Sequence, residues 1–559
     1  MTSSTNLDTL GFDVYPVQVV HHETIKMSDG CRLACKFWLP WISSDDENRL
    51  EQTEFCETLY ADRKTLQNHK RAETFPVILE YLPYRKDDFT AERDHARHPW
   101  TCSHGFVVAR VDIRGTGSSE GFYFDEYEPQ EQADCIELLN WFARQAWCNG
   151  RVGMYGKSWG GFNGLQVAYY CPEPLKAVIS LYSTDDRFND DIYYRGGHPL
   201  ANGLPMWSHQ MFLWNARPPL RRYFASDAEW RTAYRQRLER TAKSWTRSKL
   251  EHTSRDHYWK HGSVCIDYQR IEAACLVIGG LADLYTDSAF RMSAELNDQS
   301  RGIVGPWSHE WPDVCEPGPN IDFLQVCLDW WTWHLKPLSR KSATTVNVNE
   351  WPRLRVFMRA AHPPRLEYKQ QDGRWLSHPD WKDVHKQYER MLKALDSDET
   401  RRETVRNTGH TVIDVNLDKL VRPADVGKPN ENDANWIALP PSPLQGVYAG
   451  EMCPFSGGQM AQNQRTANDN SICFIINITE TLLICGQCVF MMNLNRLHKE
   501  QYDNDKRGVC VRLSHRFDET RDTLITSGHL NLALSRPIGM SPDQTTETHV
   551  VRLDFTTLV

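Results

Sequence analysis

The amino-acid sequence predicts an α/β protein with an inserted helical segment and an all-β region after it. Three observations support this. Buried strand-like runs alternate with helical runs up to about residue 185, a stretch rich in Trp, Tyr and Arg follows, and short strand-like runs recur beyond about residue 350. Alternating strands and helices imply a mostly parallel sheet covered on both faces. Short strands separated by turn signals are typical of a β-sandwich or jelly roll.

The length of the chain favours more than one domain. A chain of 559 residues exceeds what one hydrophobic core usually organises. We expect residues 1–185 and 262–348 to form the two parts of the α/β domain. Residues 186–261 are predicted as a helical cap inserted between them, and residues 349–559 as the C-terminal β-sandwich.

The first elements are a hairpin and two strands. Alternating apolar residues over Val17–Pro40, with an Asp-Gly turn in the middle, favour an opening β-hairpin. Residues 41–74 are polar and lack sustained periodicity, so they are predicted as a surface insertion. Pro76–Leu82 and Gly105–Asp112 are apolar runs with the length of buried strands.

The alternation continues beyond these strands. Pro129–Ala146 is predicted as a helix because Ile136, Leu139 and Ala143 share one face. Later strands are predicted at Leu175–Leu181, Ala274–Gly280 and Arg301–Gly305. The aromatic-rich run Leu324–Leu335 is predicted as a helix that closes the α/β region.

The cap and the C-terminal region differ in composition from the sheet domain. Asp227–Thr246 is a predicted cap helix. The cap contains several arginines, which could bind an acidic substrate or simply form a solvated helix face. They are Arg217, Arg221, Arg222, Arg231, Arg235 and Arg237.

Arg353–Met358 is predicted to start the all-β region, and residues 380–435 are charged and loop-like. Further strand-like runs are Ile472–Ile478, Gly508–Leu513, Gly528–Leu534 and His549–Phe555.

Composition argues against several classes of partner. Lys plus Arg total 64 against 73 Asp plus Glu, and this net charge of −9 does not favour nucleic acid or an anionic membrane. No run approaches the roughly 20 apolar residues of a membrane span, and the N-terminus lacks a signal-peptide pattern. The 16 cysteines are scattered singly, which favours free thiols in a reducing compartment. We therefore expect a cytoplasmic protein, and a homodimer is left open.

No cofactor or metal is expected. The pair Cys485 and Cys488 forms a lone C-x-x-C between strand-like runs. A zinc or redox site would need a second ligand pair or a helix that starts after the first cysteine, and neither is evident.

Gly156-Lys-Ser-Trp-Gly160 has the G-x-S-x-G pattern. A serine on a sharp turn between a strand and a helix is crowded, so the residues two positions away must lack side chains. Val152–Tyr155 predicts a short buried strand before the turn, and Phe162–Tyr170 predicts an apolar helix after it. A plain glycine-rich turn is the alternative. In this context, the pattern indicates the nucleophile elbow of an α/β-hydrolase, with Ser158 as the nucleophile.

A serine nucleophile needs a base, and the base needs an acid that orients it. In α/β-hydrolases these residues follow one another in the order Ser, acid, His. Asp283 and His309 each come directly after a later predicted strand, in that order. Alone, each would be an ordinary loop residue, but together they predict a triad with Ser158. Glu310 and Asp287 are the alternatives for the acid.

The tetrahedral intermediate also needs hydrogen-bond donors. The backbone N–H of Trp159, directly after the nucleophile, is one. The loop after an earlier strand offers the phenol of Tyr84 as a second donor, with a packing role as the alternative. The glycine-rich stretch at residues 112–121 lacks the spacing of a phosphate-binding loop and is predicted to brace the edge of the site.

Several further motifs occur in a fixed order along the chain. They are Ser28-Asp-Gly30, Pro83-Tyr84, Asp112-Ile-Arg-Gly115, Ser119-Glu-Gly121, Trp147-Cys-Asn-Gly150, Gly156-Lys-Ser-Trp-Gly-Gly161, Gly280-Leu-Ala-Asp283 and Gly305-Pro-Trp-Ser-His309. From about Val17 to Leu335 this combination resembles the cocaine esterase and Xaa-Pro dipeptidyl-peptidase hydrolases (the CocE/NonD family). After Leu335 the resemblance is one of architecture only.

The resemblance implies an α/β-hydrolase domain, an inserted helical cap and a C-terminal jelly roll. It also implies Ser158 as nucleophile, Asp283 as acid and His309 as base. Tyr84 and the Trp159 amide would form the oxyanion hole.

Two features depart from the family pattern. Members that hydrolyse α-amino-acid esters carry acidic residues just after the catalytic Asp, whereas this chain has Leu284-Tyr-Thr286. The C-terminal domain of the family also continues for several further strands, whereas this chain ends at Val559. The jelly roll is therefore expected to be incomplete, with an unpaired sheet edge.

The expected function is a serine hydrolase that cleaves carboxylic esters or amides through an acyl-enzyme. The substrate would be a small-molecule ester, an amide or a short peptide. An Xaa-Pro dipeptidyl-peptidase is one alternative, with the acidic cluster Asp185, Asp186, Asp190 and Asp191 as the anchor for a free N-terminus. A catalytically inactive hydrolase-like binding protein is the alternative from another class.

Overall fold

The computed structural model describes most of the chain. The described residues are 15–40, 59–60, 74–200, 203–240, 245–337, 345–395, 420–421, 448–451, 453–495, 508–532, 539–540 and 546–559. The predicted surface insertion at residues 41–74 lies almost entirely outside them, as does most of the stretch from residue 396 to 447.

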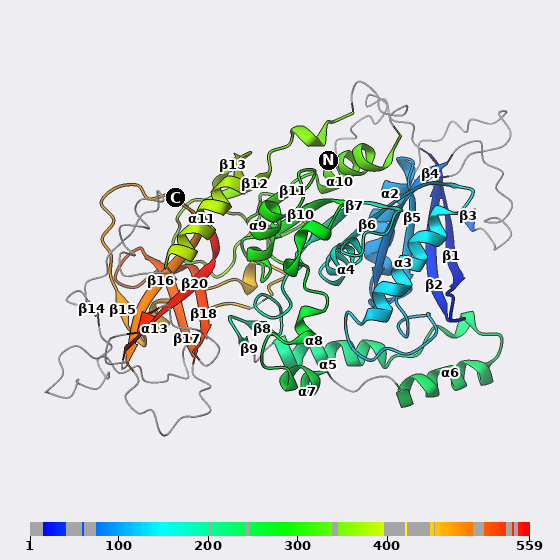
Figure 1. The fold of residues 1–559 in the computed structure, drawn as a ribbon, viewed down its shortest axis with the longest axis horizontal. Coiled ribbons are helices and arrows are strands. Elements are labelled where there is room, and N and C mark those ends of the chain that lie inside the picture. The colour runs from blue at the N-terminus through cyan, green and yellow to red at the C-terminus, as the bar shows by residue number, and fades with distance from the viewer. Residues whose placement is uncertain are drawn as a thin grey trace.

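An 11-stranded sheet organises the molecule, in the order β13-β12-β11-β10-β7-β6-β4-β5-β2-β1-β3 (Figure 1). Seven neighbouring strands, from β5 to β12, run parallel to one another. The predicted hairpin is confirmed as the antiparallel pair β1 and β2, which joins β5 at one end. The strands are β1 (Val17–Lys26), β2 (Arg32–Pro40), β3 (Leu59–Tyr60), β4 (Phe75–Leu82), β5 (Val107–Asp112), β6 (Cys148–Lys157), β7 (Leu175–Leu181), β10 (Ala274–Gly280), β11 (Arg301–Gly305), β12 (Leu354–Arg359) and β13 (Gly373–His378).

Helices cover both faces of this sheet. A Cβ added to Gly153 would lie 2.7 Å from the ring of Trp331 in α10, whereas Met154, the next residue of β6, faces Gly164 in α4. Successive residues of a strand point to opposite faces, so α10 and α4 lie on opposite sides. This arrangement confirms the α/β prediction. The helices of the sheet domain are α2 (Ala91–Ser103), α3 (Pro129–Ala143), α4 (Trp159–Ala168), α9 (Thr286–Glu295) and α10 (Phe323–Leu335).

A mainly helical segment interrupts the sheet domain between β7 and β10. Its helices lie together along the lower side of the view in Figure 1. The predicted helix from Asp227 is α6, which ends at Arg240. The segment contains β8 (Tyr194–Arg195), β9 (His198–Pro199), α5 (Gly203–Asn215), α6 (Asp227–Arg240), α7 (Thr246–Glu251) and α8 (His257–Lys260), with short 3-10 turns at Arg221–Tyr223, Val264–Ile266 and Tyr268–Arg270.

The C-terminal region is rich in β-strands, as predicted. Strand β20 pairs with β16 and with β19, and β17 pairs with β18, all antiparallel. The elements are α11 (Trp381–Leu395), β14 (Leu420–Val421), α13 (Arg465–Asp469), β15 (Cys473–Phe474), β16 (Ile484–Asn495), β17 (Gly508–Arg516), β18 (Asp522–Asn531), β19 (Gly539–Met540) and β20 (Thr546–Leu558), with 3-10 turns at Val348–Glu350 and Gly457–Gln459.

Two details differ from the sequence prediction. Arg353–Met358 was expected to open the C-terminal region, but β12 pairs in parallel with β11 and extends the main sheet. Long-range pairing decides which sheet an apolar strand joins, and the strand's own sequence does not reveal it. The predicted loop from residue 380 begins instead with helix α11, in which Trp381, His385, Tyr388 and Met391 are buried along one face.

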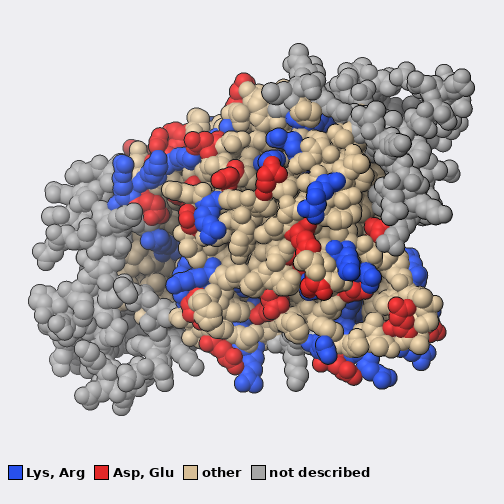
Figure 2. Space-filling view, turned by 45° about the vertical axis from the view of Figure 1, so that its right-hand side comes forward, with Lys and Arg blue, Asp and Glu red and all other residues tan. Residues whose placement is uncertain are grey.

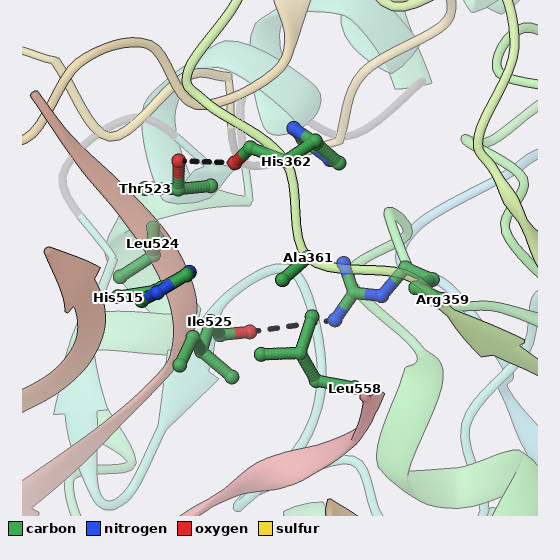
Figure 3. Close-up of a pocket in the computed structure, with 8 residues that line it drawn as sticks. All are labelled: Arg359, Ala361, His362, His515, Thr523, Leu524, Ile525 and Leu558. Carbon is green, nitrogen blue, oxygen red and sulfur yellow. Dashed lines mark hydrogen bonds between the residues drawn. The ribbon is translucent and has the colours of Figure 1, made fainter. Parts of the chain in front are cut away.

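The C-terminal strands are docked on the end of β12. The backbone N–H of Val559 donates to the carbonyl of Arg359 at 2.9 Å, and the hydroxyl of Thr523 donates to the carbonyl of His362 at 2.8 Å. The guanidinium of Arg359 also donates to the carbonyl of Thr557 at 3.1 Å. A small hollow remains between these segments, as Figure 3 shows, and its lining includes none of the predicted catalytic residues.

Candidate active site

Ser158 stands on a strained turn between β6 and α4. Its φ of 57° and ψ of −122° place a non-glycine residue in a sparsely populated conformation. A Cβ on Gly156 would lie 2.6 Å from the Cα of Gly160, so the turn closes only when both positions lack side chains. A Cβ on Gly161 would lie 2.8 Å from the hydroxyl oxygen of Ser180 in β7. The crowding expected from the G-x-S-x-G pattern is therefore present around Ser158.

Asp283 and His309 lie on the loops that follow the neighbouring strands β10 and β11. Nδ1 of His309 lies 2.8 Å from Oδ1 of Asp283, a distance at which a ring N–H donates to a carboxylate. The other carboxylate oxygen accepts the backbone N–H of Tyr285 at 3.2 Å. Both side chains are buried, so the pair is shielded from water.

Neither alternative for the acid contacts the histidine ring. The carboxylate of Glu310 pairs with Nζ of Lys157 at 3.1 Å and accepts the N–H of Trp311. The carboxylate of Asp287 accepts the backbone N–H of Phe555 at 2.6 Å. Asp283 is the carboxylate that the structure brings to His309.

Lys157 connects the serine turn to the histidine loop. Its Nζ donates to the backbone carbonyl of His309 at 3.1 Å, from the residue directly before Ser158. Among the described residues no hydrogen bond joins Oγ of Ser158 to the His309 ring. Contacts between a nucleophile and its base are often long before substrate binds.

The Tyr84 phenol lies beside the serine. Burial raises the pKa of this phenol, and hydrogen-bonding proximity to the Ser158 side chain and to the backbone N–H of Trp159 partly offsets the rise. Within the described part of the chain, its buried oxygen makes no hydrogen bond of standard geometry. A buried hydroxyl without a partner is unfavourable, so this atom suits a ligand oxygen.

The glycine-rich loop after β5 braces the Tyr84 loop. The buried carboxylate of Asp112 accepts the backbone N–H of Lys86 at 2.8 Å and that of Ser118 at 3.0 Å. The guanidinium of Arg237, from the cap, donates to the carbonyls of Gly117 and Ser119 at 2.8 and 2.9 Å. These contacts fit the predicted bracing role of the loop.

Glu131 holds the indole of Trp159 and was not singled out by its sequence context. Nε1 of Trp159 donates to Oε1 of Glu131 at 2.7 Å, and the backbone N–H of Tyr127 donates to Oε2 at 3.0 Å. Burial raises the pKa of Glu131 to about 8. No local motif marks such a residue, because its partner lies far along the chain.

Aromatic side chains surround the serine turn. The ring of Trp159 lies 4.7 Å from that of Tyr127 and 6.1 Å from that of Trp245 in the cap. The ring of Tyr84 lies 6.0 Å from Trp207 and 5.3 Å from Trp214, both on cap helix α5. The cap therefore supplies an apolar wall suited to an aromatic or aliphatic group.

A segment of the C-terminal region also reaches the site. The backbone N–H of His309 donates to the carbonyl of Pro454 at 2.7 Å. The ring of Phe455 meets the His309 ring edge to face at 5.2 Å and remains half exposed. Sequence reasoning missed this segment, because about 145 residues separate it from His309 and no motif marks it.

The acidic cluster of the cap is mostly paired with arginines. Asp185 and Asp190 bind the guanidinium of Arg291, at 2.5 and 2.7 Å. Asp186 binds that of Arg255.

Asp191 differs from the other members of this cluster. Its Oδ1 accepts the phenol of Tyr285 at 3.2 Å, and its Oδ2 has no hydrogen-bond partner among the described residues. Burial and the charge of Glu126 raise the pKa of Asp191 to about 7. The Tyr285 ring lies 5.8 Å from that of His309, which places Asp191 close to the candidate triad.

The remaining sequence predictions concern charges, metals and membranes. Figure 2 shows positive and negative side chains interspersed over the visible face. Cys485 and Cys488 lie in strand β16, and neither joins a group of three metal-ligand side chains in the described residues. Within those residues, no helix is long and apolar enough to span a membrane.

Comparison with known proteins connects this site to a family. The family described as X-Pro dipeptidyl-peptidase (S15 family) matches residues 68–311. Cocaine esterase from Rhodococcus sp. (strain MB1 Bresler) is 27% identical over 255 residues, which cover 42% of this chain and 44% of that protein. The chain therefore spans less than half the length of this curated relative.

Solved structures with the same fold align along nearly the whole chain. A CocE/NonD family hydrolase from Staphylococcus aureus has a TM-score of 0.58 at 12% identity and covers 100% of this chain and 88% of its own. An aminopeptidase from a marine sediment Thaumarchaeota archaeon has a TM-score of 0.55 at 16% identity, with the same two coverages of 100% and 88%. At these identities the likeness shows the fold alone, the α/β-hydrolase sheet with a β-rich C-terminal region. The family match covers less than half of the chain, and over residues 68–311 the chain is similar to the cocaine esterase and X-Pro dipeptidyl-peptidase hydrolases.

Proposed function

We propose that the protein is a serine hydrolase that cleaves carboxylic ester or amide bonds through an acyl-enzyme. The observation that carries the proposal is the buried Asp283–His309 pair, 2.8 Å apart, on the two loops that follow β10 and β11. The strained elbow at Ser158 lies at the same edge of the sheet, tied to the histidine loop through Lys157.

Each residue has a defined step in this mechanism. Oγ of Ser158 attacks the carbonyl carbon while Nε2 of His309 takes its proton. The Asp283 carboxylate accepts the N–H of Nδ1, which keeps that proton on the ring, and stabilises the imidazolium that forms. The Trp159 N–H and the Tyr84 phenol donate to the oxyanion of the tetrahedral intermediate. His309 then protonates the leaving group, and water repeats the sequence on the acyl-enzyme.

The aromatic surroundings favour an apolar acyl or leaving group. Trp159, Trp207, Trp214 and Trp245 lie on the serine side of the site, and Phe455 lies on the histidine side. Esters of aromatic or medium-length aliphatic acids match these walls. We therefore rank a simple ester above a charged substrate.

An Xaa-Pro dipeptidyl-peptidase is the second candidate. Asp191 supports it, because a buried carboxylate near the triad could bind the ammonium of a free N-terminus. Burial and the charge of Glu126 raise the pKa of Asp191, which favours its protonated form and weakens an interaction with an ammonium group.

The decisive experiment compares two substrates on two proteins. The wild type is assayed with p-nitrophenyl esters and with a Gly-Pro amide, and Ser158→Ala provides the blank. Faster turnover of the esters supports an esterase, and faster turnover of the amide supports a dipeptidyl-peptidase. Labelling with a fluorophosphonate should occur in the wild type and be lost in Ser158→Ala. A wild type that takes up no probe and turns over no substrate would point to the inactive binding protein.

A further inference from the structure

Three metal-ligand side chains converge at the candidate catalytic histidine. The sulfur of Cys453, a ring nitrogen of His309 and a carboxylate oxygen of Asp283 all lie within 4.8 Å of one another. Asp283 and His309 are buried and Cys453 is half-buried. The next residue after the cysteine, Pro454, accepts the backbone N–H of His309 at 2.7 Å, so the thiol is held beside the ring.

We propose that Asp283, His309 and Cys453 form a binding site for a Zn²⁺ ion, and that the bound ion switches off hydrolysis. Thiolate, imidazole and carboxylate are the ligands that zinc prefers in proteins. Three protein ligands with a fourth position left to water describe an open, reversible site rather than a closed structural one. The binding stands on this geometry, and the inhibition rests on the proposed function.

Zinc would replace the proton that His309 shares with Asp283. Nδ1 and Oδ1 are 2.8 Å apart and would separate by a few tenths of an ångström to take bonds of about 2.0–2.2 Å to the ion. The sulfur would approach to a bond of about 2.3 Å, which requires a short movement of Cys453. The thiol proton and the Nδ1 proton leave to solvent. His309 then lacks the carboxylate contact that a base needs, so attack by Ser158 stops.

A second buried cluster shows why a group of ligands is not sufficient. Glu80, Asp94 and His98 also lie within 4.8 Å of one another. The guanidinium of Arg93 lies 2.7 Å from Glu80 and 2.5 Å from Asp94, and that of Arg110 lies 3.3 Å from Asp94. These two arginines already neutralise the carboxylates and occupy the space of an ion.

The charges around Cys453 differ from those of the second cluster. The nearby cation is Lys157, whose Nζ is bound to the carboxylate of Glu310 and to the carbonyl of His309, both at 3.1 Å. Glu310 balances the charge of Lys157, and among the described residues Asp283 has no Lys or Arg partner.

Metal binding can be measured without any hydrolysis. The Ser158→Ala protein, which retains all three ligands, is titrated with Zn²⁺ by calorimetry and with Cd²⁺ by its thiolate charge-transfer absorption in the ultraviolet. Cys453→Ser in the same background should lose tight binding of one equivalent of Zn²⁺. It should also lose the part of the Cd²⁺–thiolate absorption that Cys453 contributes. We expect at least about a 100-fold loss of affinity, because even outer partners of metal ligands are worth about 10- to 100-fold.

The matched control is Cys171→Ser, which removes an exposed thiol outside the cluster. This variant should bind Zn²⁺ like its parent. Equal binding by Cys453→Ser and its parent, or no binding by the parent, would overturn the site. Because the nucleophile is absent from all of these proteins, the result does not depend on whether the protein is a hydrolase.

Inhibition is tested on the active protein. Zn²⁺ should stop ester turnover in the wild type and in Cys171→Ser, a chelator should restore it, and Cys453→Ser should need at least about 100-fold more Zn²⁺. Equal Zn²⁺ sensitivity of Cys453→Ser and the wild type would overturn the inhibitory role. A protein that binds the ion but hydrolyses no substrate would contradict the proposed function and leave the metal site intact.

Discussion

At the scale of single residues, the proposed mechanism depends on the contact between Asp283 and His309. An asparagine at position 283 has nearly the same side-chain shape as aspartate, but it carries no negative charge to stabilise the His309 imidazolium. We expect Asp283→Asn to lower kcat by about 10⁴-fold, the scale known for the same change in a serine-protease triad. The matched control is Glu310→Gln, since Glu310 binds Lys157 rather than the ring. A larger loss in Glu310→Gln than in Asp283→Asn, measured with a p-nitrophenyl ester, would reverse the assignment of the acid.

The phenol of Tyr84 can be tested by removing one oxygen. Tyr84→Phe keeps the ring among Trp207 and Trp214 and deletes the proposed oxyanion donor. We expect kcat to fall by about 10²- to 10³-fold with little change in KM, because the hydrogen bond forms fully only in the transition state. A rise in KM with unchanged kcat would assign Tyr84 to substrate binding instead.

Glu131 gives the protein a pH-dependent stability. Its pKa in the folded protein is about 8, above the usual value of 4.5. The folded state therefore holds a proton that the unfolded state releases, and stability falls as the pH rises from about 4.5 to 8. The slope is at most about 1.4 kcal/mol per pH unit. Glu131→Gln keeps an acceptor for the Trp159 indole and should flatten the dependence of Tm on pH, and an unchanged slope would contradict this prediction.

At the scale of elements, the turn between β6 and α4 is fixed by its glycines. Gly156→Ala would place a methyl group 2.6 Å from the backbone of Gly160, and no side-chain rotation can relieve a clash with backbone. We expect a loss of about 1–3 kcal/mol in stability, together with loss of the elbow geometry and of activity. Gly458→Ala is the control, because a Cβ there meets nothing within 4 Å. Thermal unfolding of the two variants gives the comparison.

At the scale of the whole molecule, the C-terminal region is tied to the rest by specific contacts. Arg195 of β8 binds Asp554 of β20 at 2.6 Å, and both are largely buried. We expect Asp554→Asn to cost about 1–3 kcal/mol, because it leaves the arginine without its carboxylate. Asp518→Asn removes a more exposed pair with Arg521 and should lower Tm less than Asp554→Asn does. Equal Tm values for the two variants would show that the Arg195 pair does not hold the regions together.

The sequence anticipated the features that depend on local pattern. The hairpin of β1 and β2, the parallel strands and the serine turn all follow from periodicity and glycine placement. The pairing of Asp283 with His309 could be anticipated because each residue directly follows a strand, whereas their catalytic roles remain a proposal. Glu131, Phe455 and Cys453 were missed, since they reach the site from distant parts of the chain without a motif. Helix α11 was also missed, although Trp381, His385, Tyr388 and Met391 recur at helical spacing.

The hydrogen bond between His309 and Pro454 bears on the order of events during synthesis. The ribosome synthesises the chain from the N-terminus to the C-terminus. Ser158, Asp283 and His309 therefore leave the ribosome well before Pro454. Until Pro454 and Phe455 have been synthesised, the backbone N–H of His309 lacks its acceptor and its ring lacks the contact with Phe455. A nascent chain that already carries the three proposed triad residues should therefore be a poor hydrolase, and turnover of a p-nitrophenyl ester should appear only when translation has passed residue 455.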